Sequence, residues 1–334
     1  MTIDLSVELA PNHKQGLRLA NPVMVASGCF GWGTEYAKLI DIQRLGAIIS
    51  KGTTLRPRKG NPMPRVAETP AGMLNAIGLQ NPGIHRVIAE KAPIWSTWRV
   101  PVLVNVAGED IDEFCECARL LEGVPGVAGI ELNVSCPNVK AGGAVFACDP
   151  TSAGDVTSAV RSATTLPLIV KLSPNVGDIV SIALAVEKAG ADCISLINTL
   201  LGMKIDIKRR RPLLGNVTGG LSGPAIRPVA VRMVYQIAQV VSIPIVGLGG
   251  ITSAEDALEF ILAGASAIQI GTGIFVDPTA PLRIIDELAQ FIESEGVGCL
   301  SELVGAANPH FAGHRQQQSA FSDRQLPEEL IAGS

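Results

Sequence analysis

The chain has 334 residues, of which 47% are hydrophobic and only 4% are aromatic, and its formal net charge is −4. This length suits one large α/β domain, and a core of aliphatic side chains is typical of a buried parallel sheet. The charge argues against a nucleic-acid-binding protein, which would need a basic face. The first residues lack the basic start and apolar stretch of a signal peptide, and no apolar run approaches the ~20 residues of a membrane span.

The seven cysteines are scattered along the chain, with no CxxC pair among them. An odd number of cysteines without a regular spacing is typical of a protein kept in a reducing compartment. We therefore expect a cytoplasmic protein that binds neither zinc nor an iron–sulfur cluster by itself.

Residues 1–20 are expected to form a β-hairpin that turns at Pro11-Asn12-His13. After it, short β-rich runs alternate with amphipathic stretches such as Asp178–Ala189 and Ala254–Leu262, each followed by an Ala-Gly-Ala that predicts a helix end. Eight strand–helix units favour a closed (β/α)8 TIM barrel over an open sheet. The predicted strands are Pro22–Ala26, Ala47–Lys51, Val102–Val106, Gly129–Val134, Leu168–Leu172, Cys193–Asn198, Pro244–Leu248 and Ala267–Gly271.

Two connections, from about Arg56 to Arg99 and from Thr199 to Pro224, are too long for plain barrel loops. Long loops after strands are where a barrel keeps its active site. The second contains the basic run 208–211, which favours a solvated loop over a site for a polyanion or a partner. We expect one barrel domain over residues 1–305 and a mostly mobile tail over 306–334, in which a short helix at Pro327–Ile331 is possible.

Polar residues interrupt the predicted strands or follow them directly, although barrel strands are usually apolar. An unpaired buried charge or amide costs several kcal/mol, so a polar ligand at the barrel mouth is favoured over pairing within the protein. Asparagines suit a ring with amide-like edges, and lysines suit a carboxylate, a phosphate or an anionic flavin ring. We expect Glu131 to neutralise a neighbouring cation. The interrupting residues are Lys51, Asn105, Glu131, Asn133, Lys171 and Asn198, with Asn75 in the first long loop.

Glycine turns follow the last two predicted strands, at Gly247–Gly250 and at Gly271–Gly273. In barrels, the loops after these strands commonly bind phosphate through backbone N–H groups, which glycine allows to come close. A phosphate site beside a mouth lined with amides indicates a phosphorylated cofactor such as FMN.

Cys136 follows the fourth predicted strand, between Ser135 and Pro137. A buried structural cysteine is the common alternative, but this position lies in a loop at the barrel mouth. A thiol with a pKa near 8.5 can act as a base near neutral pH, whereas Ser135 would need strong activation. We assign the other cysteines to packing.

Several joined motifs resemble those of the class 1 dihydroorotate dehydrogenases, and most closely the NAD-linked subclass 1B catalytic subunit. The resemblance extends over about residues 3–305. The motifs are Ala26–Gly28, Ser50–Thr54, Asn75–Asn81, Glu131–Asn138, Lys171–Pro174, Asn198-Thr199, Gly220–Gly223, Gly249-Gly250 and Gly271-Thr272.

The resemblance implies a set of positions for each ligand. FMN would be held by Ser27, Lys51, Gly52, Asn105, Asn133, Lys171, Ile197, Gly223, Gly249, Gly250, Gly271 and Thr272. The pyrimidine would be held by Lys51, Asn75, Ala76, Ile77, Gly78, Leu79, Asn133, Asn198 and Thr199. Cys136 stands where class 1 enzymes have their catalytic cysteine.

The family oxidises dihydroorotate to orotate in de novo pyrimidine biosynthesis. By resemblance, Cys136 removes the C5 proton, FMN accepts the C6 hydride, and the loop from about Val139 to Asp149 closes over the substrate. The resemblance also implies a homodimer joined to a partner subunit that carries an iron–sulfur cluster and FAD and passes electrons to NAD, a heterotetramer in total. No nucleic acid, membrane or metal ion is expected as a partner of this chain.

Two other functions remain open from the sequence. One is a dihydropyrimidine dehydrogenase subunit, which shares a Ser-Cys-Pro loop but acts on dihydrouracil-type rings without a carboxylate. The other is a phosphate-binding barrel without redox activity, which would be colourless when purified.

Overall fold

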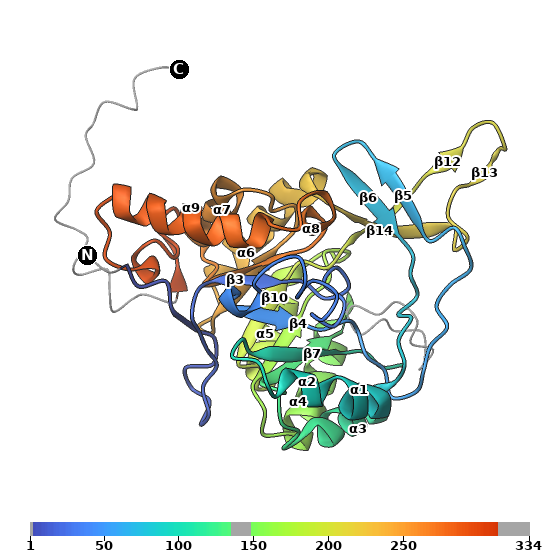
Figure 1. Cartoon of the computed structure of the whole chain (residues 1–334), viewed down its shortest axis with the longest axis horizontal. Helices are drawn as coiled ribbons and strands as arrows, with labels where there is room; N and C mark the ends of the chain where they lie inside the picture. The colour runs from blue at the N-terminus through green and yellow to red at the C-terminus, as the bar shows by residue number, and fades with distance from the viewer. Residues whose placement is uncertain (1–2, 135–147, 313–334) are drawn as a thin grey trace.

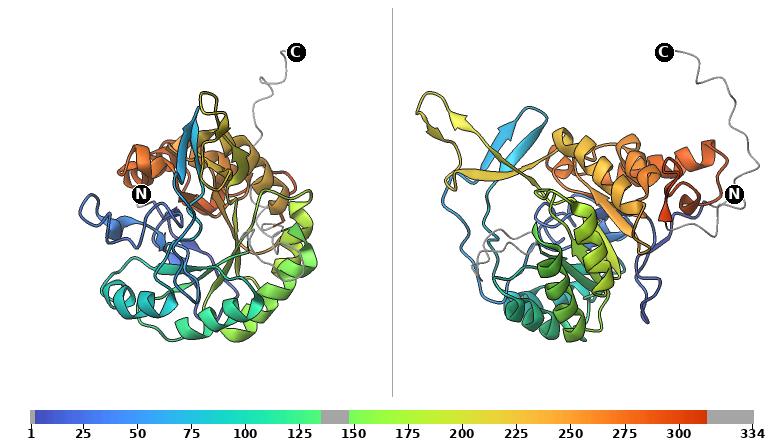
Figure 2. Two further views of the ribbon diagram at one scale, coloured as in Figure 1. Left: turned by 90° about the vertical axis from the view of Figure 1, so that its right-hand side faces the viewer. Right: turned by 180° about the vertical axis from the view of Figure 1, so that it is seen from behind.

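The computed structural model describes residues 3–134 and 148–312. Parallel strands form a closed barrel, ordered β10-β15-β16-β3-β4-β7-β8-β9, with helices around it (Figures 1 and 2). The predicted (β/α)8 barrel and each of its strands are therefore confirmed. The strands are β3 (Val23–Val25), β4 (Ala47–Ile49), β7 (Val102–Val106), β8 (Gly129–Asn133), β9 (Leu168–Lys171), β10 (Cys193–Leu196), β15 (Ile245–Leu248) and β16 (Ala267–Ile270).

Short side chains start several of the outer helices. Asp110, Asp149, Asp178 and Ser253 each accept a backbone N–H from the first turn that follows. Gly264 ends α7 with a φ of 127°, and a Cβ there would lie 2.4 Å from the Cβ of Ala238. The α-helices are α1 (Ile84–Glu90), α2 (Ala92–Trp95), α3 (Ile111–Leu121), α4 (Pro150–Ala163), α5 (Ile179–Lys188), α6 (Arg227–Ala238), α7 (Ala254–Ala263), α8 (Gly273–Val276) and α9 (Ala280–Ser294), and the 3-10 turns are Ile42–Arg44, Pro224–Ile226 and Leu300–Glu302.

The predicted N-terminal hairpin is present as β1 (Val7–Glu8) and β2 (Arg18–Leu19). Its buried Leu9, Leu17 and Leu19 belong to one apolar cluster with Met24 and Val246, which lie in barrel strands. The hairpin thus packs on the interior of the barrel, and the polar strand ends lie at the opposite, carboxyl end.

The two long connections come together in one antiparallel sheet, ordered β11-β14-β6-β5, which projects from the barrel (Figure 1). The first connection supplies β5 (Val66–Thr69) and β6 (Gly72–Asn75), and the second supplies β11 (Leu200–Met203) and β14 (Thr218–Ser222). Between β11 and β14, an arm is formed by β12 (Ile205–Asp206) and β13 (Arg211–Pro212). The basic run 208–211 is exposed on this arm, as expected for a solvated loop.

None of the helices in the described ranges is long and apolar enough to cross a membrane. The described residues end at residue 312, so most of the predicted tail, including Pro327–Ile331, lies outside them. The division at residue 305 stays a prediction.

Candidate active site

The predicted site residues gather at one rim, because all the barrel strands are parallel and end at the same side. Most lie in the last residues of a barrel strand or in the segment that follows it. Gly223 follows β14. Residues 75–79 begin with the last residue of β6 and continue into the loop after it. Cys136 and most of the predicted closing loop lie outside the described residues. The rim residues are Ser27 after β3, Lys51 and Gly52 after β4, Asn105 in β7, Asn133 in β8, Lys171 in β9, Ile197, Asn198 and Thr199 after β10, Gly249 and Gly250 after β15, and Gly271 and Thr272 after β16.

Glu131 is fully buried in the centre of this set. The Nζ of Lys171 lies 3.6 Å from its Oε2, and Asn105 Nδ2 donates to the same oxygen at 2.6 Å. The Oε1 accepts from Ser195 Oγ at 3.0 Å and from Gln269 Nε2 at 2.8 Å. A buried carboxylate is tolerated only with such partners. The prediction that Glu131 neutralises a neighbouring cation is confirmed, and the cation is Lys171.

Ser195 and Gln269 are absent from the set predicted from sequence. Each is a fully buried polar residue inside a barrel strand, in Cys193–Leu196 and Ala267–Ile270. The criterion that selected Asn105, a polar residue within an apolar strand, therefore applied equally to both.

Two of the predicted amides are in direct contact. Asn198 Nδ2 donates to Asn133 Oδ1 at 3.3 Å, and Asn198 Oδ1 accepts the backbone N–H of Thr199 at 2.8 Å. Asn133 is also the strand neighbour of Lys171 in the β8–β9 register. Amides and an ammonium are thus adjacent, a combination that can bind a ring with carbonyl, N–H and anionic groups.

The projecting sheet brings Asn75 to this group. Asn75 pairs with Gly220 across β6 and β14, and its Nδ2 donates to the Gly220 carbonyl at 3.4 Å. A Cβ on Gly220 would lie 2.0 Å from Thr199 Oγ1, so Thr199 packs directly against the same backbone.

Asn81, the last residue of the motif 75–81 and one without a predicted role, holds the loop that follows Asn75. Its side chain is almost fully buried, and Nδ2 donates to the Leu79 carbonyl at 2.7 Å and to Thr54 Oγ1 at 2.9 Å. Its Oδ1 accepts from the backbone N–H groups of Gly83 and Thr54. These bonds hold Leu79, which has a φ of 53°, against the segment after β4 that contains Lys51. Lys51 also lines an open hollow of about 500 Å³ with Arg58 and Lys59.

The glycine turns pack closely against the backbones of neighbouring segments. A Cβ on Gly250 would lie 2.7 Å from the Gly223 carbonyl oxygen, and a Cβ on Gly273 would lie 2.8 Å from that of Ile251. Gly271 differs, since a Cβ there would meet nothing closer than 3.6 Å. The packing of the described chain therefore does not require glycine at position 271, whereas a ligand lying against this turn would.

Buried oxygens without partners supply a second test of the cofactor prediction. Asn105 Oδ1 and Gln269 Oε1 are buried and accept no hydrogen bond from the described residues. Their amides cannot be flipped without loss, because the nitrogens donate to Glu131. Asn105 Oδ1 faces Gly52, where a Cβ would lie 3.2 Å from it. A ring with N–H donors at the rim and a phosphate at the glycine turns satisfies these features, so the residues present fit FMN.

The assignment of the remaining cysteines to packing is partly wrong. Cys115, Cys117 and Cys193 are buried, but Cys148 is exposed, and Cys29 and Cys299 are partly exposed. Cys29 lies on the turn after β3 at the open rim, with its Sγ 3.6 Å from the position of a Cβ on Gly271. Burial raises the pKa of the Cys29 thiol to about 11, although Lys171 acts in the opposite direction.

Comparisons with known proteins place the chain in a family. The family model described as dihydroorotate dehydrogenase matches residues 10–292. The chain is 56% identical to a protein of Pelobacter propionicus over 306 residues, 92% of this chain and 99% of that protein. It is 55% identical to a protein of Geotalea uraniireducens over 303 residues, 91% of this chain and 98% of that protein. A protein of Desulforudis audaxviator is 55% identical over 293 residues, 88% of this chain and 95% of that protein.

All three relatives are named dihydroorotate dehydrogenase B (NAD(+)), catalytic subunit. The family match covers the barrel strands and most of the helices around them, and the relatives align with nearly their whole length. On this evidence, the chain belongs to the dihydroorotate dehydrogenase family.

Proposed function

We propose that this chain is the catalytic subunit of an NAD-linked dihydroorotate dehydrogenase. It oxidises (S)-dihydroorotate to orotate in pyrimidine biosynthesis. The observation that carries the proposal is the convergence of Asn133, Asn198 and Lys171 at one rim of a barrel of this family.

The bound cofactor in this proposal is FMN, which would serve as the oxidant by accepting a hydride from C6 of the substrate. The glycine turns at 249–250 and 271–272, with Gly223, would hold its phosphate through backbone N–H groups. Asn105 would accept from the ring, Lys171 would favour negative charge on it, and Glu131 would hold Lys171 in place through their ion pair. The remaining predicted contacts, Ser27, Lys51, Gly52, Asn133, Ile197 and Thr272, complete the set.

The substrate would lie between the rim and the loop after Asn75. Lys51 would pair with the carboxylate, and Asn75, Asn133 and Asn198 would orient the ring amides, with Thr199 and residues 76–79 around them. Cys136 would remove the C5 proton. This part of the proposal is supported by its position in the chain, three residues after the last residue of β8. An ordinary cysteine thiol has a pKa near 8.5, so a fraction of such thiols is thiolate near neutral pH and can act as a base.

The proposed assembly is a homodimer of this chain joined to an electron-transfer subunit with FAD and a [2Fe–2S] cluster, a heterotetramer. The name "catalytic subunit" carried by the relatives implies such a partner. Pairing of two copies is supported by exposed apolar side chains on β11 and the arm, including Leu201 and Ile207, because contiguous exposed apolar surface commonly marks an interface. A cytoplasmic location is supported by free cysteines at the described positions.

Purification of the chain with and without the candidate partner tests the activity. We expect a yellow protein with flavin absorbance near 450 nm and dihydroorotate oxidation that reduces NAD once the partner is present. A preference for dihydrouracil would indicate the dihydropyrimidine dehydrogenase function, and a colourless protein would indicate a barrel without redox activity. Transfer to fumarate without the partner would contradict the NAD-linked subclass.

Replacement of the proposed base tests the chemistry. Cys136→Ala should keep FMN and substrate binding and lower turnover by roughly 10²–10⁴-fold at neutral pH, the usual contribution of a general base. Cys299→Ala is the matched control, since Cys299 contacts Ser301 and Glu302 rather than the rim. Near-wild-type turnover in Cys136→Ala would reject the assignment.

A further inference from the structure

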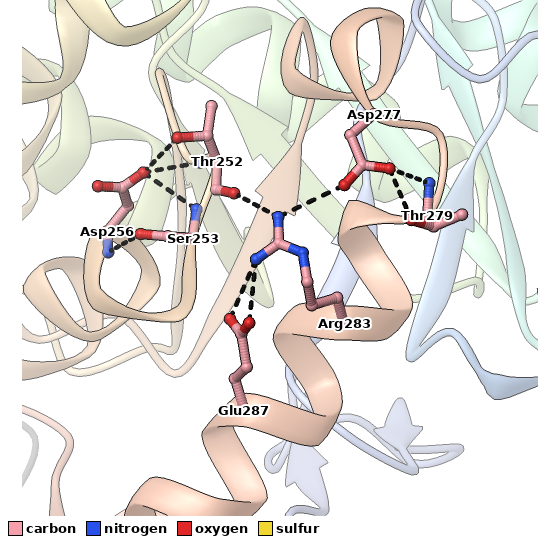
Figure 3. A network of polar contacts seen from close by, with 7 residues as sticks. All are labelled: Thr252, Ser253, Asp256, Asp277, Thr279, Arg283 and Glu287. Carbon is pink, nitrogen blue, oxygen red and sulfur yellow. Dashed lines mark hydrogen bonds and ion pairs between the residues drawn. The ribbon is translucent and has the colours of Figure 1, made fainter.

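A polar network joins the segments that follow the two glycine turns of the rim (Figure 3). The turn after β15 continues through Ile251 and Thr252 to α7, and the turn after β16 continues through α8 to Asp277. Arg283, in the first turns of α9, lies between these segments, with its guanidinium pointing toward both (Figure 3).

Thr252 is bonded at each of its polar atoms. Its N–H and Oγ1 donate to Asp256 Oδ2 at 2.8 and 2.7 Å, and its carbonyl accepts from Arg283 Nη2 at 3.0 Å. Desolvation works against ionisation of Asp256, but hydrogen bonds from Thr252 and the charge of Arg227 outweigh it and lower the pKa of that carboxyl. Asp256 is therefore a charged acceptor at neutral pH, and Thr252 is held between α7 and α9.

Arg283 also contacts the segment after the second turn. Its Nη2 lies 3.5 Å from Asp277 Oδ2, and its Nη1 donates to both oxygens of Glu287 at 3.1 and 3.2 Å. Asp277 is itself fixed, because its Oδ1 accepts the N–H and the Oγ1–H of Thr279, and its N–H donates to the Gly273 carbonyl. The bonds from Thr279, assisted by Arg283, lower the pKa of Asp277, so this pair is charged at neutral pH.

The backbones of the segments at the two turns approach each other closely. The hypothetical Cβ on Gly273, 2.8 Å from the Ile251 carbonyl oxygen, shows how close the backbones lie. The β15–β16 ladder sets the spacing of the strands up to Leu248 and Gln269, and beyond the ladder the contacts of Arg283 tie Thr252 to Asp277. Arg283 bonds to both sides, and its planar guanidinium keeps those bonds in one geometry.

We propose that Arg283 is a positioning residue for the cofactor phosphate. By bridging the Thr252 carbonyl and the Asp277 carboxylate, it keeps the two glycine turns at the spacing at which N–H groups of both reach one phosphate. This inference rests on the proposed function, since the phosphate is that of FMN. It predicts an effect specific to the phosphate, because Arg283 lies behind the turns and bonds to neither ring-binding residue, Asn105 nor Lys171, in the contacts described above.

The test compares flavin release from the purified holoprotein, by following flavin fluorescence on dilution, with displacement of bound FMN by riboflavin, which lacks the phosphate. Arg283→Gln should weaken FMN binding about tenfold, the order expected for charge-assisted bonds at a partly exposed site. The FMN–riboflavin exchange equilibrium should move toward riboflavin by the same factor, because riboflavin binding itself is unchanged. Arg283→Lys should give an intermediate loss of FMN affinity, because a lysine ammonium keeps the positive charge but lacks the planar set of N–H donors of a guanidinium.

The matched control is Arg86→Gln, since Arg86 forms a similar exposed ion pair with Glu90 within α1, away from the turns. Its FMN affinity should equal that of the wild type. If Arg283→Gln yields no folded protein, Glu287→Gln removes an anchor of the guanidinium without touching either turn, and a two- to threefold weakening is expected. An unchanged FMN affinity in the folded Arg283→Gln variant would overturn the inference, and the same holds for Glu287→Gln if that variant has to replace it. Equal losses of affinity for FMN and for riboflavin would also overturn it. A wild-type chain that binds neither flavin would overturn the proposed function and the inference with it.

Discussion

At the scale of single residues, the rim is a set of polar groups whose hydrogen bonds meet in one buried carboxylate. Glu131 receives contacts from Asn105, Lys171, Ser195 and Gln269, which lie in separate strands. This arrangement orients the two amides so that their oxygens accept no hydrogen bond from the described residues, and it places the Lys171 ammonium beside a buried carboxylate. A buried group of this kind is costly alone and stable only as a complete network.

Removal of the negative charge tests this network. Glu131→Gln removes the carboxylate charge beside the Lys171 ammonium, whose side chain is 6% exposed, so we expect the free energy of unfolding to fall by about 3–5 kcal/mol. Urea unfolding followed by circular dichroism measures it. The double variant Glu131→Gln/Lys171→Met should recover most of the loss, since no buried charge is left. A single variant as stable as the wild type would mean that Lys171 does not depend on Glu131.

The Cys29 thiol gives a prediction for pH dependence. With its pKa raised by burial from 9.0 to about 11, the thiolate fraction at pH 8 is about a hundredfold lower than for an ordinary cysteine. In the flavin-free chain, alkylation of Cys29 by iodoacetamide, measured by mass spectrometry, should be slower by that factor and should keep rising up to about pH 11. Because the folded-state pKa is the higher one, the stability contributed by the neutral thiol is complete below pH 9 and is lost between pH 9 and 11. Alkylation that levels off near pH 9 would contradict this assignment.

At the scale of elements, two insertions far apart in the chain complete the site by pairing with each other. The register of β6 and β14 sets Asn75 opposite Gly220, and Thr199 packs on that glycine. Asn81 then fixes the loop after β6, because its side chain donates hydrogen bonds both to Leu79 in that loop and to Thr54. The loop proposed to bind the substrate is thus positioned by a buried amide outside the proposed set of substrate contacts.

Loss of this amide should affect binding more than chemistry. Asn81→Ala removes the bonds to Leu79 and Thr54, so the loop loses its fixed position, and we expect the KM for dihydroorotate to rise about tenfold with kcat changed less than about threefold. Steady-state kinetics at saturating acceptor measures both. Asn216→Ala, at an exposed asparagine bonded to the Thr218 carbonyl, is the control. A fall in kcat with an unchanged KM would place Asn81 in the chemical step instead.

At the scale of the whole molecule, one end of the barrel is closed by the N-terminal hairpin and the other carries the site and the projecting sheet (Figure 2). The side chains of Leu201 and Ile207 are 68% and 86% exposed on β11 and the arm. Such apolar exposure on a projecting element is what a second protein surface would cover.

Charge substitutions on this surface test the proposed homodimer. Leu201→Glu/Ile207→Glu should convert the dimer to a monomer without loss of folding, because both side chains are exposed within one chain. Sedimentation velocity measures the change, and Leu39→Glu, at a side chain 63% exposed on another part of the surface, is the control. A wild-type chain that sediments as a monomer, or a double variant that remains a dimer, would refute this interface.

The sequence by itself determined the barrel, because each strand is a short apolar run between helical patterns and that periodicity is local. It also determined which polar residues interrupt the strands, so Asn105, Glu131, Asn133 and Lys171 could be selected before their partners were known. The roles of Ser195, Gln269 and Asn81 were decided by the tertiary structure, since a serine, glutamine or asparagine acquires a role only when distant strands or loops bring it a partner. The same holds for Cys29, whose raised pKa results from burial in the folded chain, and for Arg283, whose contacts join segments remote in the chain. No local sequence pattern encodes that pKa or those contacts.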